Sequence, residues 1–166
     1  MKRNQGFTLV EILIVVVILG ILAAIVVPKV SNASQTAREN TLRDDVRFLR
    51  TQITVYAAQH HDLNPGYPGG DSTQTATGPT FVAQMTSFTD DLGNTSATGS
   101  AVYAYGPYLS QMPINPSNSM VTILIVDGTG PMTPDGTTGW LFQPQTGAIL
   151  PNIVGNDCTG TPFATY

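Results

Sequence analysis

The chain opens with a long unbroken apolar run. Within residues 7–27 the only charged residue is Glu11, and two cations, Lys2 and Arg3, precede the run. A helix rises about 1.5 Å per residue, so a run of this length covers roughly 32 Å, enough to cross the apolar core of a bilayer. Positive charge before such a segment favours an N-terminus on the cytoplasmic side. The pattern predicts one membrane-spanning helix, with the following chain outside the cytoplasm.

The helical pattern continues after this run but becomes two-faced. Apolar residues recur every three or four positions, at Leu42, Val46, Leu49, Ile53 and Tyr56. This spacing places them on one stripe of a helix, which we expect to pack on the chain's own C-terminal domain. A sequence rich in Pro and Gly over residues 64–70 ends the pattern near His61. The predicted helix therefore covers residues 7–61, roughly 80 Å in length.

The remaining sequence predicts a small domain of the α+β class. Residues 62–119 indicate an irregular connection with one short set at helical spacing, namely Phe81, Val82, Met85 and Phe88. Residues 120–154 predict a small antiparallel β-sheet of about three strands. A β-branched apolar run at 120–126 is expected to be its central strand, and segments 140–143 and 148–150 to form a hairpin. Residues 155–166 are expected to be a loosely ordered C-terminal tail.

Charge is divided unevenly along the chain. The first 50 residues hold all seven Lys and Arg and four acidic residues, a net charge of +3, whereas residues 51–166 hold seven Asp and no Lys or Arg, a net charge of −7. A domain without basic side chains cannot neutralise phosphates, which excludes nucleic-acid binding by this part of the chain. An acidic domain on a more basic stem offers electrostatic complementarity between stacked subunits, or simply keeps an exported protein soluble.

Few residues suggest catalysis. His60 and His61 are adjacent, so on a helix they point about 100° apart, and we expect both to be solvated near its C-terminal carbonyls. The pair Asp90 and Asp91 lies in a polar stretch and is also expected to be solvated. The sequence contains no Gly-rich phosphate loop, and its single cysteine, Cys158, excludes an intramolecular disulfide. We therefore expect that the protein is not an enzyme.

Glu11 is the unusual residue of the apolar run. A carboxylate inside a membrane helix is costly and by default indicates a function. One interpretation places it at the headgroups, where it is tolerated. The other gives it a cationic partner: cleavage after Gly6 creates an amino group four residues before Glu11, on the same helix face of its own or a neighbouring subunit.

The N-terminal residues resemble the class III signal of type IV pilins and type II secretion pseudopilins. The shared features are a basic leader (residues 1–6), a Gly6–Phe7 cleavage point, a Glu five residues into the mature chain, and an apolar run. The resemblance implies cleavage between Gly6 and Phe7 by a prepilin peptidase, methylation of the Phe7 amine, and pairing of Glu11 with the Phe7 amine of an adjacent subunit. Pro28 lies where these families carry a helix-kinking proline, and it removes one helical hydrogen bond. Gly20 has weak helix propensity, so a soft segment is expected between these two positions.

The resemblance also implies a pilin-like fold. It divides the chain into a transmembrane and filament-core helix (7–28), an amphipathic helix half (29–61), an αβ-loop (62–119), a β-sheet (120–154) and a tail (155–166). The Met112-Pro113 stretch is similar to the segment before the sheet in major pseudopilins. Those proteins carry a calcium loop, for which this chain offers only weak candidates, Asp127 and Asp135, beside the scattered Asp157. Calcium requires six to eight oxygen ligands, so we expect no cofactor.

The function implied is that of a structural subunit in a filament assembled at the inner membrane. The resemblance favours a type II secretion pseudopilus, with further copies of the chain, a prepilin peptidase, an inner-membrane assembly platform and minor pilins or pseudopilins as partners. The subunit is expected first as a single-pass inner-membrane protein and then in a periplasmic or surface filament. Three alternatives are a type IV pilus subunit (adhesion, motility or DNA uptake), a membrane-tethered binding module, and a secreted protein with an ordinary signal peptide.

Overall fold

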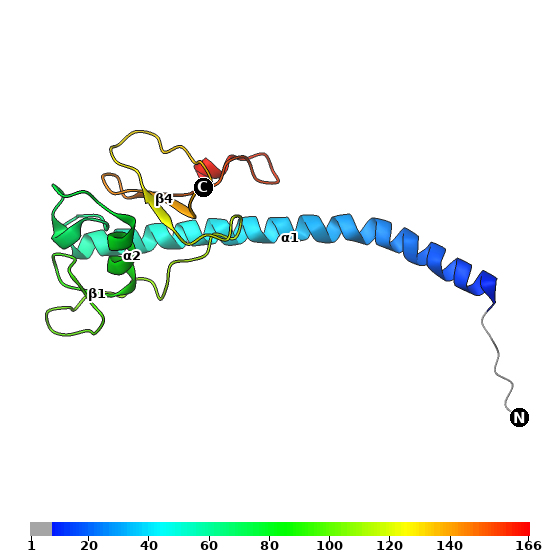
Figure 1. Ribbon diagram of the computed structural model, residues 1–166, viewed down its shortest axis with the longest axis horizontal. Coiled ribbons are helices and arrows are strands. Elements are labelled where there is room, and N and C mark those ends of the chain that lie inside the picture. Colours follow the sequence, from blue (N-terminus) through cyan, green and yellow to red (C-terminus); the bar gives the residue numbers. More distant parts are fainter. Residues whose placement is uncertain (1–7) are drawn as a thin grey trace, which may run out of the picture. The chain divides into compact units, whose positions relative to one another are not determined.

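The computed structural model describes residues 8–166, except for the side chains of residues 27, 28, 31 and 32. It divides into two units, Met1–Ala37 and Arg38–Tyr166, and we call the second unit the head. One helix, α1 (Leu9–Gln59), contributes to both units, which confirms the long N-terminal helix (Figure 1). The other elements all belong to the head: η1 (Pro68–Gly70), α2 (Gly78–Thr86), β1 (Phe88–Thr89), β2 (Thr95–Ser96), β3 (Ile123–Ile125), β4 (Trp140–Gln143), β5 (Ala148–Pro151) and η2 (Phe163–Thr165).

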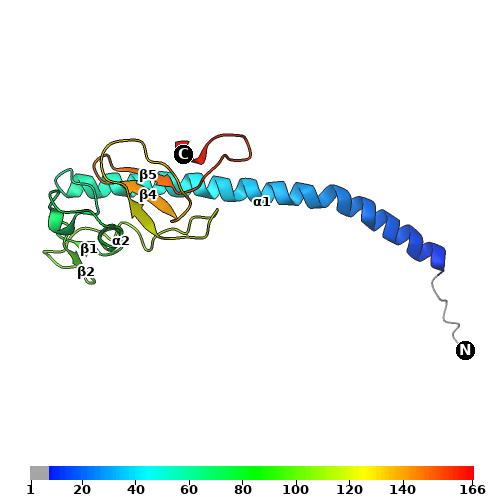
Figure 2. The same ribbon diagram turned by 45° about the horizontal axis from the view of Figure 1, so that its top comes forward.

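The core of the head forms on one face of α1. The predicted stripe is buried, with no member more than 2% exposed: Leu42, Val46, Leu49, Ile53 and Tyr56. These side chains belong to one apolar cluster with residues of the sheet and of α2, among them Trp140, Phe142 and Phe81. In Figure 2, β4 and β5 lie alongside this half of α1. The spacing of apolar residues in the sequence thus identified the face of the helix that is buried.

The three-stranded sheet has the order β3-β4-β5 and is mixed. β4 and β5 form the predicted antiparallel hairpin, with Trp140 opposite Pro151 and Gln143 opposite Ala148. The expectation of three antiparallel strands is wrong for β3, which runs parallel to β4. The expectation that 120–126 is the central strand is also wrong, since β3 lies at the edge. The connection 126–139 is long enough to return the chain to the starting end of the sheet, which a parallel pairing requires.

The segment predicted as irregular contains α2 and a two-stranded ribbon, β1-β2. The Thr77 side chain caps the start of α2 by accepting a hydrogen bond from the Thr80 amide at 3.2 Å. Phe81 and Met85 are fully buried, as their helical spacing predicted. The buried Gln84 side chain secures the neighbouring loops, accepting from the Gly66 amide and donating to the carbonyls of Tyr67 and Gly93.

Residues 155–166, which we call the C-terminal segment, are held in place along the head. The expectation of a loose tail is wrong. Phe163 is buried, and the short helix η2 orders the last residues. The Asp157 carboxylate organises the preceding turn, because it accepts hydrogen bonds from the amides of Thr159 and Thr161, both at 2.8 Å. Hydrogen bonding by a buried acid therefore fixes a segment whose composition suggested disorder.

Candidate functional site

The first part of α1 is apolar on all sides and exposed on all sides. Leu9–Val26 has a mean hydropathy of 3.2 over 18 residues, long and apolar enough to cross a membrane. Its large side chains are 50–83% exposed, from Val15 to Leu9. A helix without a polar face is stable only where apolar surroundings cover it, in a bilayer or among other helices.

Glu11 lies in the first turn of α1 and forms a reciprocal cap with Thr8. The Thr8 amide and hydroxyl donate to Glu11 Oε2 at 2.7 and 2.8 Å, and the Glu11 amide donates to Thr8 Oγ1 at 3.2 Å. The Thr-x-x-Glu spacing is the capping box, in which two side chains satisfy amides that a helix start leaves without partners. Glu11 therefore has a partner at the start of its own helix, namely Thr8.

The remaining residues that the sequence singled out in this region are the cleavage pair and the two expected helix-softening positions. Gly6 and Phe7 lie outside the described residues. A Cβ added at Gly20 would have no neighbour within 4 Å among the residues that the structure describes, so no contact between them requires glycine there. α1 is assigned as helix through positions 20 and 28, so neither Gly20 nor Pro28 ends it. The softening that we expect between them stays a prediction.

The two calcium candidates are both held by hydrogen-bond donors. Asp135 Oδ1 accepts from the Thr137 amide at 2.9 Å and from Asn152 Nδ2 at 2.7 Å, while Asp127 accepts from Gln145. These bonds lower the pKa of Asp135, with the Thr137 amide as the largest cause. Over residues 8–166, no three acidic, His or Cys side chains come together as a metal site. We therefore do not propose calcium at these residues.

His60 is buried, which corrects the expectation that it is solvated. Only 3% of its surface is exposed, and its ring stacks on Tyr56 with centroids 3.8 Å apart. Its Nδ1 lies 2.7 Å from the Tyr56 carbonyl oxygen and its Nε2 lies 3.0 Å from Thr89 Oγ1. His61 is exposed, as expected, and lies 3.8 Å from Asp91. His60 thus closes the end of α1 in the core and has a structural role.

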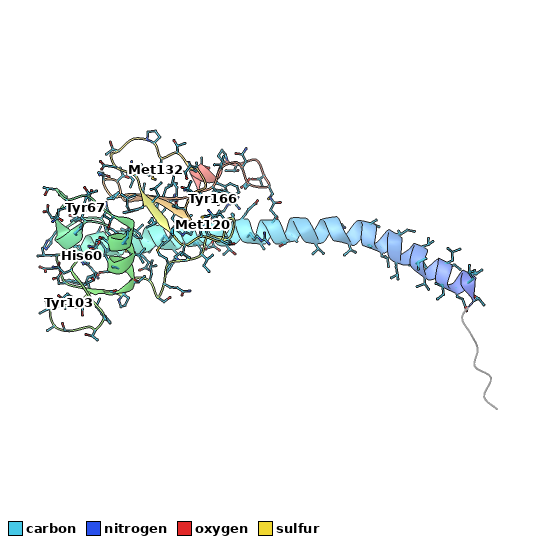
Figure 3. All side chains as sticks on the ribbon, in the orientation of Figure 1. His60, Tyr67, Tyr103, Met120, Met132 and Tyr166 are labelled. Carbon is cyan, nitrogen blue, oxygen red and sulfur yellow. The ribbon has the colours of Figure 1, made fainter. Side chains whose placement is uncertain are left out.

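A cluster around Asp157 joins the C-terminal segment to α1, and the sequence reasoning missed it. Asp157 forms an ion pair with Arg43 and accepts from the Tyr166 hydroxyl at 2.7 Å. The Arg43 guanidinium lies over the Tyr166 ring, 4.6 Å from its centroid, and Figure 3 labels Tyr166 beside α1. Burial raises the pKa of the Asp157 carboxyl, but hydrogen bonds led by Thr159 and Tyr166 outweigh this and lower it. Burial and the bond to Asp157 raise the pKa of Tyr166 to about 12.

Comparison with known proteins connects the N-terminal part of the chain to secretion systems. Residues 1–27 match the family described as "Prokaryotic N-terminal methylation motif", which confirms the prepilin-type signal. The chain is 42% identical over 55 residues to type II secretion system core protein G of Pseudomonas aeruginosa, covering 33% of this chain and 39% of the relative. The corresponding protein of Dickeya chrysanthemi is 40% identical over 55 residues, covering 33% of this chain and 36% of the relative.

A third relative is "ComG operon protein 3 homolog" of Bacillus licheniformis, 31% identical over 63 residues, which cover 38% of this chain and 65% of the relative. The chain spans about two fifths of the length of the core G proteins that it matches. No solved structure matches it significantly. The methylation motif, the similarity to core protein G and the long apolar helix are together consistent with a subunit of the pilin and pseudopilin family.

Proposed function

We propose that this chain is a structural, non-catalytic subunit of a type II secretion pseudopilus, a filament assembled from the inner membrane. The observation that carries the proposal is the methylation motif at residues 1–27, which continues into a helix with exposed apolar side chains on every side. The similarity to core G proteins of type II secretion systems supports this assignment over a type IV pilus subunit.

In this proposal the apolar surface of Leu9–Val26 is always covered, first by lipid and then by the helices of other copies. Before assembly, Leu9–Val26 lies in the bilayer, with Lys2 and Arg3 on the cytoplasmic side and the head outside the cytoplasm. During assembly the same surface leaves the lipid and packs on the corresponding helices of other copies. A prepilin peptidase cuts between Gly6 and Phe7, and an assembly platform with other pseudopilins receives the processed subunit.

Glu11 serves the assembly step by pairing with the Phe7 amine of a neighbouring copy. The capping box means that a simple deletion cannot test this role, because Glu11→Ala removes both the cap and the charge. Glu11→Gln separates the two functions: Gln can also close a capping box, but it carries no charge. Thr8→Ala is the matched control, since it removes the hydroxyl of the cap and keeps the carboxylate.

The experiment compares sheared filaments and total membrane protein for the three variants and the unchanged chain. We expect Glu11→Gln and Glu11→Ala to reach the membrane at normal levels and to be lost from filaments, while Thr8→Ala still assembles. Normal filaments from Glu11→Gln would overturn the pairing of Glu11 with the Phe7 amine. An uncut Met1, with no filaments from the unchanged chain, would instead support a membrane-tethered module. Normal protein export in a strain lacking the chain, with loss of surface pili, would support the pilus alternative.

A further inference from the structure

Three arginines line one side of a groove on the head. Arg43, Arg47 and Arg50 follow each other at spacings of four and three residues, which places them on one face of α1. The C-terminal segment forms the opposite wall with Thr161, Thr165 and Tyr166, and the groove has a volume of about 430 Å³. The groove exists because the C-terminal segment is docked on the helix.

The three arginines are used differently within the chain. Arg43 is paired with Asp157, and Arg50 donates to the carbonyls of Tyr166 and, at 3.2 Å, of Ile149. Arg47 contacts only the carboxylate of Asp44 among the ion pairs of residues 8–166, at 3.5 Å, and its side chain is 75% exposed. The outer two guanidinium groups are therefore fixed in position, and the middle one is free to receive an anion from outside. Each guanidinium has five N–H donors, so the fixed groups also retain donors for a second partner.

The anion that the chain itself supplies is an aspartate. Residues 51–166 contain seven Asp and no Lys or Arg, and four of these Asp are exposed: Asp62, Asp91, Asp127 and Asp135. The last two are engaged by side-chain amides of their own chain. The Asp91 side chain is 63% exposed, and its one ion-pair contact among residues 8–166 is the His61 ring, with Oδ2 3.8 Å from Nε2. Asp62, next to His61 in the sequence, is also exposed. The acidic residues best able to accept an outside cation thus lie near the end of α1.

The groove and these acidic residues lie toward opposite ends of the head. Arg47 and the end of α1 at Gln59 are 12 residues apart on one continuous helix, about 18 Å. Tyr166 lines the groove, and in Figure 3 it lies well apart from His60, which is at the far end of α1. Two different patches that face opposite ends of one subunit can pair head to tail, and such a contact generates an open filament when its rotation does not close into a ring.

We propose that the Arg43–Arg47–Arg50 groove binds the Asp62 and Asp91 carboxylates of a second copy of this chain. The contact rests on the proposed filament function and adds to it a specific interface between heads, separate from the packing of apolar helices. Because Arg47 is exposed in the single subunit, its substitution leaves the core of the head intact.

A disulfide cross-link tests the contact directly. Cys158→Ser removes the single cysteine, and Arg47→Cys and Asp91→Cys are then placed on separate, co-produced chains. Asp91 is chosen because Asp62 has a φ of 60°, where substitution brings strain. We expect oxidised filaments to contain a dimer with one chain of each kind. Asp127→Cys in place of Asp91→Cys is the matched control and is expected to give none.

Charge exchange tests whether the contact matters for assembly. We expect Arg47→Asp to reduce filament yield by about tenfold, and Arg47→Asp with Asp91→Arg to restore it to within about twofold. Arg47→Asp with Asp127→Arg is expected to stay defective. Trp140 fluorescence in each variant checks that the head is folded.

The possible results distinguish failure of the groove contact from failure of the proposed filament function. Filaments without the cross-link and without charge rescue would overturn the groove contact and leave the proposed function standing. Cross-linking through Asp127 at equal yield would also overturn it. A chain that forms no filaments in its native membrane would overturn both proposals.

Discussion

One face of α1 is buried in the core of the head. Ala substitutions at two neighbouring residues of this helix are therefore expected to lower the stability of the head by very different amounts. Leu49 is 0% exposed and belongs to the apolar cluster that contains Trp140 and Phe142. Phe48, one residue earlier, is 49% exposed and points away from that cluster. Substitution of each residue by Ala therefore compares a buried and an exposed position on the same helix turn.

The magnitude follows from burial. Leu→Ala at a fully buried site costs about 2–5 kcal/mol, because the apolar transfer energy is lost and a cavity remains. The head has about 130 residues, for which unfolding entropy is roughly 0.27 kcal/mol/K. A loss of about 3 kcal/mol therefore lowers Tm by about 11 °C. For Phe48→Ala the expected loss is below about 1 kcal/mol, or less than about 4 °C.

The assay is thermal unfolding of the full-length chain in detergent, followed by Trp140 fluorescence. Trp140 is the single tryptophan and is fully buried in the head, so its emission reports the head and is insensitive to the apolar end of α1. Equal shifts in Tm for Leu49→Ala and Phe48→Ala would refute the assigned face of the helix. So would a shift of less than about 4 °C for Leu49→Ala.

Three further predictions use the same readout. Gln84→Ala leaves three buried backbone groups without their partner and is expected to destabilise the head by about 2–4 kcal/mol; an unchanged denaturation midpoint contradicts this. Gly139→Ala places a Cβ against the Met120 carbonyl and is expected to cost about 1–3 kcal/mol, whereas Gly130→Ala, which meets nothing within 4 Å, is the neutral control. The pKa of Asp157 is lower in the folded state, so its stabilisation is full above about pH 5 and is lost as pH falls below about 4. Asp157→Asn is expected to flatten that part of the stability profile, and a profile identical to that of the unchanged chain would count against the cluster.

Local periodicity predicted the helical parts of the fold well. The stripe from Leu42 to Tyr56 has a spacing set by 3.6 residues per turn and proved buried. In the predicted set around Phe81, Phe81 and Met85 are buried, whereas Phe88 lies beyond α2 in β1 and is half-buried. The predicted hairpin β4-β5 also joins neighbouring segments of the sequence, with four turn residues between its strands. In each case the residues that set the pattern lie within 14 positions of one another.

The errors involve partners that are distant in sequence. The direction of β3 depends on which end of β4 it meets, and a run of β-branched residues carries no information on that choice. His60 is buried because Thr89 and Tyr105 approach it from a later segment. Asp157 is fixed by Arg43, 114 positions away. These contacts depend on the tertiary fold, which composition alone did not indicate.

One feature of the candidate site was readable in the sequence. Thr8-Leu9-Val10-Glu11 has the Thr-x-x-Glu spacing of a capping box directly before an apolar run, a recognised signal of a helix start. Glu11 is thus both the single charge of the apolar run and the residue that closes the cap of α1. Both roles are compatible, since the carboxylate caps its own helix in the single chain and the proposed pairing with an amine would form only on assembly.

The most direct test of the filament assignment is the mass of the N-terminal peptide from sheared filaments or native membranes. We expect a chain that begins at Phe7 with a methylated amine, because residues 1–27 match the methylation motif. A chain that begins at Met1 would contradict the filament function and leave a tethered module. A chain that begins beyond Ala24 would mean that the apolar run is a cleaved signal and that the head is secreted.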